Sequence, residues 1–547
     1  MIDIKTFGFN ISNKLSNQLL SQRGIFDEYS AKKFFLSPIT EIKKPINLPS
    51  INIGTERIIK SVNKNEKIGI FGDFDADGLT GTAIIARTIK KIGGEVIPYI
   101  PNRDKDGHGL SEEAVKSFYD ANVKLIITVD TGSTALKETK LATELGIDTI
   151  ITDHHIPPDV LPTVVALINP MLNESIECEY SGSGVAFKLS QALCDKLNLD
   201  FPEELLPLAA IGTIADSSPL IGENRNIVKN GLEILARTKL AGVKTLLEKS
   251  KSDRFFGKPN TELVSFQLAP RLNAPGRLGD SEPALQILMT DNNQDAIAIS
   301  DRLDDINNQR KEYSNKAWEM ASIQIETQNN PIISVELSDV PLGILGPTAG
   351  KIVDQTGKPA IVFQNYDDLI KASCRSNEYI DIHKCLYKSN NLLNKFGGHA
   401  AAAGFTVSNK YIDEVIKIAN ETASKNSDIP KSKPFQPDAI IDMNELTPEL
   451  WKFIRAMEPY GKSNPEPLFH IKSAQISNIK NLGINKNHLK LNLITENKTI
   501  EGIGFGLGQT PLGSGKVDIT FRLSTNNWRG RIKDQIEIKD IVPSKIV

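Results

Sequence analysis

The chain has 547 residues, of which 40% are hydrophobic and 24% are charged, and its net charge is −3. This composition is typical of a globular protein of roughly three or four domains, and it excludes collagen-like and wholly disordered chains. The near balance of acidic and basic residues also excludes a simple polycation that coats nucleic acid.

Cysteine content and hydropathy indicate a cytoplasmic protein. The four cysteines form no CxxC pair, so we expect neither a disulfide framework nor a cysteine zinc site. No apolar run approaches the roughly 20 residues that cross a bilayer. The first residues lack the basic-then-apolar order of a secretory signal. We therefore expect no membrane attachment.

The first half of the chain alternates strand-like and helix-like segments. Residues 1–50 carry short apolar patches and end in several prolines, which indicates a helical lead-in. Residues 68–71 form a short apolar run, followed by the acidic segment Gly72-Asp-Phe-Asp-Ala-Asp-Gly78 and a helix-like stretch over 80–92. This order of strand, acidic loop and helix opens a domain that we place at 51–298.

The same order recurs further along the chain. Residues 124–129 form a β-branched run that ends at Asp130, and residues 148–152 form another that ends at Asp153-His154-His155. Helix-like sequence at 133–145 separates them. Strands that alternate with helices predict a parallel sheet. Because ligands bind such sheets beyond the carboxyl ends of the strands, the acidic clusters can converge in space.

The first acidic segment admits two interpretations. An EF-hand calcium loop is excluded, because Ile84 stands where the twelfth position needs a glutamate. Carboxylates at alternate positions repel one another and need a cation or extensive hydrogen bonding, unless the segment is a solvated acidic turn. Two adjacent histidines after a later strand, without thiolates, favour Mn²⁺ or Mg²⁺ over structural zinc. Together with Asp130 and Asp216 they predict a metal centre.

The second half of the chain predicts a linking helix and two further domains. Residues 299–330 are polar and favour a helix, which suits a connection between domains. Residues 331–423 contain a strand-like run at 360–363 and the glycine-rich Gly397-Gly-His399, which indicate a second α/β domain. Residues 438–547 have short alternating strands that are typical of a small β-barrel or sandwich.

The C-terminal segment is locally basic. Between residues 471 and 547, twelve Lys and Arg stand against six Asp and Glu. A protein that binds single strands needs cationic side chains along the phosphates and aromatic rings that stack on the bases. Trp528 and Phe521 could supply such rings. Solvated strand faces and core aromatics are the alternative interpretation.

The ordered motif set resembles that of the DHH phosphoesterase superfamily, and within it the chain is similar to the RecJ family of single-stranded-DNA exonucleases. The resemblance runs from about residue 20 to the end. It departs from the family pattern at His108 and at Val340-Pro341. The motifs that carry it are Gly72-Asp-Phe-Asp-Ala-Asp-Gly78, Asp130-Thr-Gly132, Asp153-His-His155, Gly212-Thr-Ile-Ala-Asp216, Pro101-Asn-Arg103, Pro270-Arg-Leu-Asn-Ala-Pro-Gly-Arg277, Ser373-Cys-Arg375, Gly397-Gly-His-Ala-Ala-Ala-Ala-Gly404 and Glu458-Pro-Tyr-Gly-Lys-Ser-Asn-Pro465.

The resemblance implies a DHH catalytic domain, a DHHA1-like domain and an OB-like nucleic-acid-binding domain. It implies hydrolysis of single-stranded DNA from the 5′ end at a two-metal centre of Mn²⁺ or Mg²⁺. The implied metal ligands are Asp75, Asp77, Asp130, His154 and Asp216. The implied catalytic residues that complete or orient the centre are Asp73, Asp153, His155 and His399. Residues suited to the DNA end, its phosphates or its bases are Arg103, Arg271, Arg277, Ser373, Arg375, Gly398 and Trp528.

Three other functions stay open at this point. The chain could be a small-substrate phosphoesterase acting on short oligonucleotides, a catalytically inactive scaffold that binds single-stranded DNA during replication, or a metal-stabilised α/β protein with no nucleic-acid role. The basic C-terminal segment disfavours the first, and the intact acidic and histidine motifs disfavour the second. For the exonuclease, we expect a monomer that works with a helicase and a single-stranded-DNA-binding protein.

Overall fold

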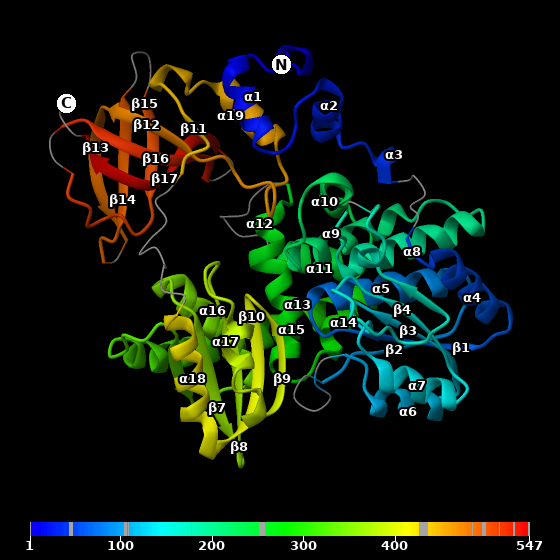
Figure 1. Cartoon of the computed structure of the whole chain (residues 1–547). Coiled ribbons are helices and arrows are strands. Elements are labelled where there is room, and N and C mark those ends of the chain that lie inside the picture. Colours follow the sequence, from blue (N-terminus) through cyan, green and yellow to red (C-terminus); the bar gives the residue numbers. More distant parts are fainter. Residues whose placement is uncertain are drawn as a thin grey trace.

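The computed structural model describes residues 2–42, 48–102, 107, 109–176, 178–250, 258–425, 436–483, 485–494, 499–512, 515–528 and 531–544. In these residues the chain forms three β-sheets, and a long helix runs between the first two (Figure 1). The predicted arrangement of two α/β domains joined by a long helix and followed by a β domain is confirmed. Among the described residues, no helix combines the length and apolar composition needed to cross a membrane.

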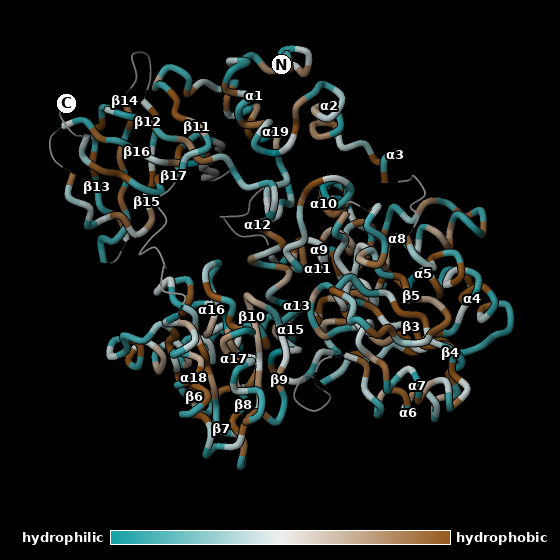
Figure 2. The backbone as a smooth tube through the Cα atoms, viewed as in Figure 1, coloured by the Kyte–Doolittle hydropathy of each residue, from teal (hydrophilic) through white to brown (hydrophobic). Residues whose placement is uncertain are grey.

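The first sheet is fully parallel, as predicted, and has the order β2-β1-β3-β4-β5. Its strands are β1 (Lys67–Gly72), β2 (Val96–Tyr99), β3 (Val123–Val129), β4 (Asp148–Thr152) and β5 (Ala166–Ile168). Side chains alternate between the two faces, so Ile68 and Ile70 enter one core while Phe71 enters another. Because both faces are covered, the strands are hydrophobic almost throughout (Figure 2).

Helices cover both faces of this sheet. One face packs against α4 (Ile51–Asn63), α5 (Ala76–Lys91) and α8 (Gly182–Lys196), and the other against α6 (Glu112–Asp120) and α7 (Leu136–Glu144). The first core extends into α9 (Leu206–Ala215), α10 (Gly222–Leu235), α11 (Ala241–Ser250) and α14 (Glu282–Met289). One further helix begins as α12 (Thr261–Leu263), widens into a π-helical segment (Val264–Leu268) and continues as α13 (Ala269–Arg277).

The long helix α15 (Asn293–Ile325) has 33 residues and is therefore about 50 Å long. Leu303 of this helix belongs to the core of the first domain, whereas Ala317 belongs to the core of the second. The helix thus anchors both domains along its length.

The second sheet is mixed, with the order β6-β7-β8-β10-β9, and only the β6–β7 pair is parallel. Its strands are β6 (Ile333–Leu337), β7 (Ala360–Tyr366), β8 (Leu369–Arg375), β9 (Leu393–His399) and β10 (Ala402–Ser408). Helix α16 (Leu345–Thr356) packs on one face, and α17 (Ile382–Tyr387) and α18 (Ile412–Ser424) pack on the other.

The third sheet has seven strands in the order β11-β12-β16-β17-β15-β14-β13. These are β11 (Ala439–Ile440), β12 (Phe469–Ala474), β13 (Ile476–Leu482), β14 (His488–Ile494), β15 (Thr499–Gly504), β16 (Val517–Trp528) and β17 (Arg531–Pro543). Helix α19 (Pro448–Ala456) packs on the sheet, and Trp451 donates its indole N–H to Ser524 O at 3.1 Å.

The N-terminal helices share the core of this C-terminal domain. They are α1 (Asn13–Ser21), α2 (Glu28–Leu36) and α3 (Ile39–Ile42), and residues of α1 and α2 join the same hydrophobic cluster as β12, β14 and β16. Phe9 meets Phe453 edge-on with ring centroids 5.3 Å apart, and Gln18 Nε2 donates to Asp438 O at 2.8 Å. The two ends of the chain therefore fold as one unit (Figure 1).

Candidate metal centre

Acidic residues stand in a row along one edge of the first sheet, where its strands end. Asp73 directly follows β1, Asp130 follows β3 and Asp153 follows β4. Each backbone N–H donates to the final carbonyl of the neighbouring strand, namely Asp73 to Val129 at 3.2 Å, Asp130 to Thr152 at 2.9 Å and Asp153 to Ile168 at 3.1 Å. The hydrogen-bond ladder of the sheet thus fixes the order of these carboxylates.

The segment after β1 turns directly into helix α5. Asp75 is the N-cap of that helix, and its Oδ1 accepts from the N–H groups of Asp77 at 2.9 Å and Gly78 at 3.1 Å. A Cβ on Gly78 would lie 2.5 Å from Asp73 O, so the tight turn requires glycine here. The acidic segment is therefore an ordered helix cap rather than a solvated turn.

Asp77 is held at the centre of the site by the start of another helix. Its Oδ2 accepts from the Gly182 N–H at 2.6 Å and its Oδ1 from the Ser183 N–H at 2.9 Å, both in the first turn of α8. The side chain is 1% exposed. Burial, together with the nearby charge of Asp216, raises the pKa of Asp77 to about 6.

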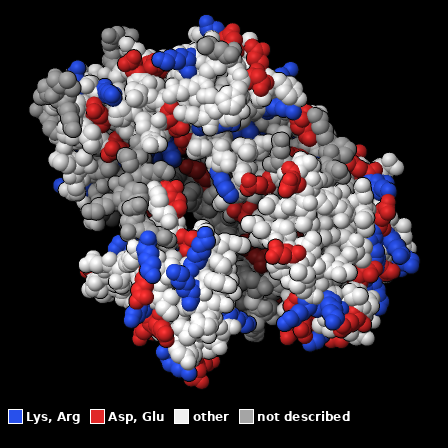
Figure 3. Space-filling model, viewed as in Figure 1, with Lys and Arg blue, Asp and Glu red and all other residues white. Residues whose placement is uncertain are grey.

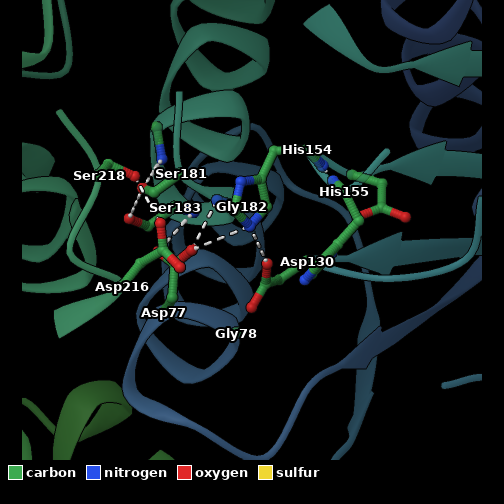
Figure 4. A network of polar contacts seen from close by, with 12 residues as sticks. Asp77, Gly78, Asp130, His154, His155, Ser181, Gly182, Ser183, Asp216 and Ser218 are labelled. Carbon is green, nitrogen blue, oxygen red and sulfur yellow. Dashed lines mark hydrogen bonds and ion pairs between the residues drawn. The ribbon is translucent and has the colours of Figure 1, made fainter. Parts of the chain in front are cut away.

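Asp130 is buried beside His154. His154 Nε2 lies 3.0 Å from Asp130 Oδ1 and 3.9 Å from Asp77 Oδ2, so the imidazole sits between the two carboxylates (Figure 4). Apart from this ion-pair contact, Asp130 Oδ1 accepts no hydrogen bond from the described residues. Burial and the neighbouring carboxylates, Asp77 first, raise the pKa of Asp130 well above its usual value.

Asp153 orients the two histidines. Its Oδ1 accepts from the N–H groups of His154 at 2.8 Å and His155 at 3.2 Å, and its Oδ2 accepts from the Ser133 N–H at 2.9 Å. Asp153 Oδ1 also lies 2.8 Å from His155 Nδ1. Burial alone would raise the pKa of Asp153, but the hydrogen bond and charge of His155 lower it to about 2. The bond to Asp153 raises the pKa of His155 to about 9.

The donor atoms form one continuous cluster. Three sets, each with its atoms within 4.8 Å of one another, are Asp73, Asp75 and Asp130; Asp130, His154 and His155; and Asp77, His154 and Asp216. Asp130 links the first two sets and His154 links the last two. Carboxylates and imidazoles without thiolates suit Mn²⁺ or Mg²⁺. The buried and crowded carboxylates, with an Asp130 oxygen that accepts no hydrogen bond from the described residues, fit a site that cations neutralise.

Glycines allow the elements around the cluster to approach closely. A Cβ on Gly182 would lie 2.4 Å from Asp130 Cβ, and one on Gly212 would lie 2.5 Å from Asp77 Oδ1. Gly212 belongs to α9, whose C-cap is Asp216, so the missing side chain brings that carboxylate toward Asp77. Ser218 donates to Asp216 Oδ2 and fixes it further (Figure 4).

Arg277 joins the first domain to the second near this site. Its Nη1 donates to Gly343 O at 3.2 Å, just before helix α16 begins. A Cβ on Gly346, in the first turn of α16, would lie 3.2 Å from both Ser373 Oγ and Arg375 Nη2. Arg277, Ser373 and Arg375 therefore gather around the start of α16, where N–H groups favour anions.

The face of the second sheet that α16 partly covers is basic. The strand register pairs Arg375 with Ala402 and Ala402 with His399, which places Arg375 and His399 on one face. Lys371 and Lys395 share this face through Thr406. His399 is exposed at the end of β9, which excludes a structural turn around a buried histidine. Gly398 has φ 132°, and a Cβ there would lie 2.4 Å from Ala402 O, so the bend itself requires glycine.

Arg310 is a further basic residue near the cluster, and the sequence motifs do not predict it. With Arg277, Asn273 and Ser217 it lines a cavity of about 240 Å³ next to the end of α9. Burial lowers the pKa of Arg310, and in the part of the chain that the structure describes no carboxylate lies within 4.0 Å of it. No motif marks this lone arginine in a polar helix, so only the structure reveals its position.

The other predicted site residues either form contacts away from the cluster or lie outside the described residues. Arg271 is paired with Asp304 of α15, with 2.6 Å between Nε and Oδ1. Arg103 and His108 lie outside the described residues, and only the backbone of Trp528 is described. The departure at Val340 is buried in the core of the second domain.

Three family models match the chain and together cover most of it. Residues 67–213 match the DHH family N-terminal domain, residues 329–425 match the DHHA1 domain, and residues 437–540 match the RecJ OB domain. These ranges correspond to the first sheet and its helices, the second sheet and the third sheet. The OB-like character of the C-terminal domain is thereby confirmed.

Curated relatives and solved structures extend the match over almost the whole chain. The chain is 36% identical to the single-stranded-DNA-specific exonuclease RecJ of Bacillus subtilis over 96% of its own length and 68% of the relative's. It is 30% identical to the Escherichia coli protein of that name, with 91% of each covered. A crystal structure of Thermus thermophilus RecJ with Mn²⁺ superposes with a TM-score of 0.84 at 28% identity, covering 97% of this chain and 76% of that one.

Proposed function

The chain belongs to the RecJ family of single-stranded-DNA-specific exonucleases, and we propose that it hydrolyses single-stranded DNA in the 5′ to 3′ direction and releases mononucleotides. The observation that carries this proposal is the continuous cluster of carboxylates and imidazoles at the edge of the first sheet. The basic side chains beside it, from both α/β domains, supply a surface for a phosphate backbone. We assign the activity to DNA repair and recombination.

The metal ligands in this proposal are Asp75, Asp77, Asp130, His154 and Asp216. Their contacts support the assignment, because all five contribute donor atoms to the cluster. Two bound Mn²⁺ or Mg²⁺ ions would lower the pKa of a water and neutralise charge on the phosphoryl oxygens. Relatives crystallised with Mn²⁺ or Mg²⁺ support the choice of metal.

The residues around these ligands orient the site. Asp73 completes the acidic end of the cluster, and Asp153 fixes the backbone that carries both histidines. Since Nδ1 of His155 faces Asp153, its Nε2 is the atom available to donate to a phosphoryl oxygen. His155 is 57% exposed, which leaves room for substrate beside it.

The 5′ phosphate is proposed to bind at the start of α16. Arg277, Ser373 and Arg375 supply two guanidinium groups and a hydroxyl there, and the helix start supplies N–H groups. Arg310 lines the same cavity as Arg277 and would bind the next phosphate of the strand. His399 and the backbone at Gly398 extend this surface along β9. Arg103, Arg271 and Trp528 stay predictions as further DNA contacts.

Digestion of end-labelled DNA tests the function directly. Single-stranded DNA with a 5′ label should release labelled mononucleotide at once in Mn²⁺ or Mg²⁺, whereas a 3′ label should be released last. Duplex DNA and chelator-treated reactions should show no release. Release from the 3′ end first, or equal cutting of duplex DNA, would contradict the proposal.

We infer that the chain acts as a cytoplasmic monomer on strands that a helicase opens or that a single-stranded-DNA-binding protein holds. Sedimentation of the full chain tests the monomer, and stimulation of digestion by an added helicase tests the supply of strands.

A further inference from the structure

Helix α13 lies between the first and second domains, close to the metal centre (Figure 1). Figure 3, in the same view, shows a hollow between the three parts of the molecule, with charged side chains on its rim. The helix carries the whole motif Pro270-Arg-Leu-Asn-Ala-Pro-Gly-Arg277. This motif contains Asn273, to which the proposed function assigns no role, although its side chain reaches the segment that bears two proposed metal ligands.

Asn273 completes the N-terminal cap of helix α5. Its Oδ1 accepts from the Ala76 N–H at 2.7 Å, across 197 residues of sequence. The first N–H groups of a helix have no partner within the helix, and the N-cap residue Asp75 accepts only from those of Asp77 and Gly78. Asn273 therefore supplies the acceptor that the N-cap does not. Because Ala76 lies between Asp75 and Asp77, this hydrogen bond holds the backbone that joins two proposed metal ligands.

Helix α13 also packs tightly against its neighbours on both sides of the site. A Cβ on Gly276 would lie 2.9 Å from Phe74 O, in the residue just before Asp75, so a side chain would not fit there. The next residue, Arg277, donates through Nη1 to Gly343 O at 3.2 Å, and a Cβ on Gly343 would lie 2.4 Å from Arg277 O. The helix thus fixes the acidic segment relative to the second domain.

The hydrogen bond to Ala76 also fixes the orientation of the Asn273 amide. Because a backbone N–H can only donate, the side-chain oxygen must face Ala76 and the NH₂ group is turned away from it. Asn273 lines the cavity that it shares with Arg277 and Arg310. The two ends of the amide therefore differ in chemistry: the oxygen binds the acidic segment, whereas Nδ2 donates to no residue that the structure describes.

We propose that Asn273 is a positioning residue of the metal centre, whose side-chain oxygen holds the backbone between Asp75 and Asp77 in the arrangement that binds the cations. The inference rests on the proposed function, because it takes these two carboxylates as metal ligands of the nuclease. Asn273 acts through the backbone of other residues, so its loss should weaken metal binding and turnover without abolishing either. A residue that only capped a helix would change stability alone.

The test uses the full chain and three substitutions at one position. Asn273→Leu and Asn273→Ala both remove the acceptor oxygen, whereas Asn273→Asp keeps an acceptor and removes the NH₂ group. Asn292→Leu is the matched control, because Asn292 Oδ1 caps the start of α15 in the same way, accepting from the Gln294 N–H at 2.8 Å. Equilibrium dialysis gives the Mn²⁺ dissociation constant, thermal unfolding gives Tm, and digestion of a 5′-phosphorylated single strand gives kcat and KM.

Asn273→Leu and Asn273→Ala should each raise the Mn²⁺ dissociation constant about tenfold and lower kcat about tenfold, as is typical when a residue that orients metal ligands is lost. Asn273→Asp should keep both values close to those of the unmodified chain, because a carboxylate oxygen accepts the same hydrogen bond. Asn292→Leu should lower Tm, as the loss of a helix cap does, but leave the Mn²⁺ dissociation constant and kcat unchanged.

Two results would overturn this inference while leaving the proposed function intact. One is an unchanged Mn²⁺ dissociation constant and kcat in the folded Asn273→Leu or Asn273→Ala chain. The other is an Asn273→Asp chain that loses as much as Asn273→Ala, which would assign the effect to the NH₂ group instead of the oxygen. If the unmodified chain binds Mn²⁺ but fails to degrade single-stranded DNA, the proposed function fails instead, and dialysis still measures the effect of Asn273 on metal binding.

Discussion

The edge of the first sheet and the basic face of the second sheet carry opposite charges in different surroundings. Asp77, Asp130 and Asp153 are at most 4% exposed, and hydrogen bonds or ion pairs fix them in place. His399 and Lys395 are exposed on the α16 side of the second sheet, and Arg375 on the same face is partly buried beside the start of α16. Buried like charges need a cation from outside, whereas accessible cations need only a polyanion. We infer that the first region performs the hydrolysis and the second holds the DNA.

The largest effect should come from removing a buried carboxylate of the first region. Asp130→Ala deletes the residue that links two sets of donor atoms, so hydrolysis should fall by about a thousandfold or more, equivalent to about 4 kcal/mol of activation free energy. Binding of single-stranded DNA should change little, because the basic face is intact. Initial rates and filter binding measure both, with the exposed Asp120→Ala as control. Near-normal turnover of Asp130→Ala would contradict the claim that the first region performs the hydrolysis.

The next largest effect is the pH dependence of stability, which comes from the buried carboxylates of the first region. Because folding raises the pKa of Asp77 to about 6, the folded chain binds this proton more tightly than the unfolded chain. In chelator, the free energy of unfolding should therefore fall by roughly 3 kcal/mol as the pH rises from about 4 to about 6. Added Mn²⁺ should offset this loss, so its gain in Tm should be larger at pH 7 than at pH 5.

Thermal unfolding at both pH values, with EDTA or Mn²⁺, checks this expectation. The Asp153–His155 pair changes stability in other pH ranges. The stabilisation from Asp153 is lost as the pH falls from about 4 to about 2, and that from His155 is lost as it rises from about 6.5 to about 9. Asp77→Asn should reduce the loss of stability between pH 4 and 6. A gain in Tm with Mn²⁺ that is the same at pH 5 and pH 7 would count against the assignment.

Arg310→Ala should have an intermediate effect. The guanidinium is partly buried beside the cavity and has no acidic partner within 4.0 Å among the described residues, so a phosphate is its natural counterion. Its loss should lower kcat/KM on single-stranded DNA by about thirtyfold, or about 2 kcal/mol. The neighbouring Lys311→Ala, on an exposed part of the same helix, is the control. Equal values for the two variants would remove Arg310 from the substrate path.

The smallest effect tests the second region by itself. Arg375→Ala should lower kcat/KM about tenfold on 5′-phosphorylated strands and much less on strands with a 5′ hydroxyl, because one charged hydrogen bond is lost. The exposed Lys388→Ala serves as the matched control. The same loss on both kinds of end would reject the 5′-phosphate site while leaving the metal centre untouched.

The sequence was sufficient to predict that these carboxylates and histidines lie together, because the signals that mark them are local. Asp73, Asp130 and Asp153 directly follow apolar strands, and the rule for parallel sheets places such residues at one edge. Arg271 and Arg277 look equivalent in the sequence, but only the structure shows that Asp304, on a different helix, pairs with the first. That difference depends on a tertiary contact, which no local pattern encodes.

The place of the N-terminal helices also depends on contacts between distant segments. The N-terminal helices, which the sequence presents as a lead-in, complete the core of the C-terminal domain through contacts such as Phe9 with Phe453. Composition and motifs carry no information on this arrangement.

Metal binding by the full chain tests the central claim most directly. Equilibrium dialysis with Mn²⁺ at pH 7 should find about two ions per unmodified chain and fewer for Asp130→Ala, and removal of those ions should stop DNA hydrolysis. An unmodified chain that binds no Mn²⁺ and still degrades single-stranded DNA in excess EDTA would contradict the account.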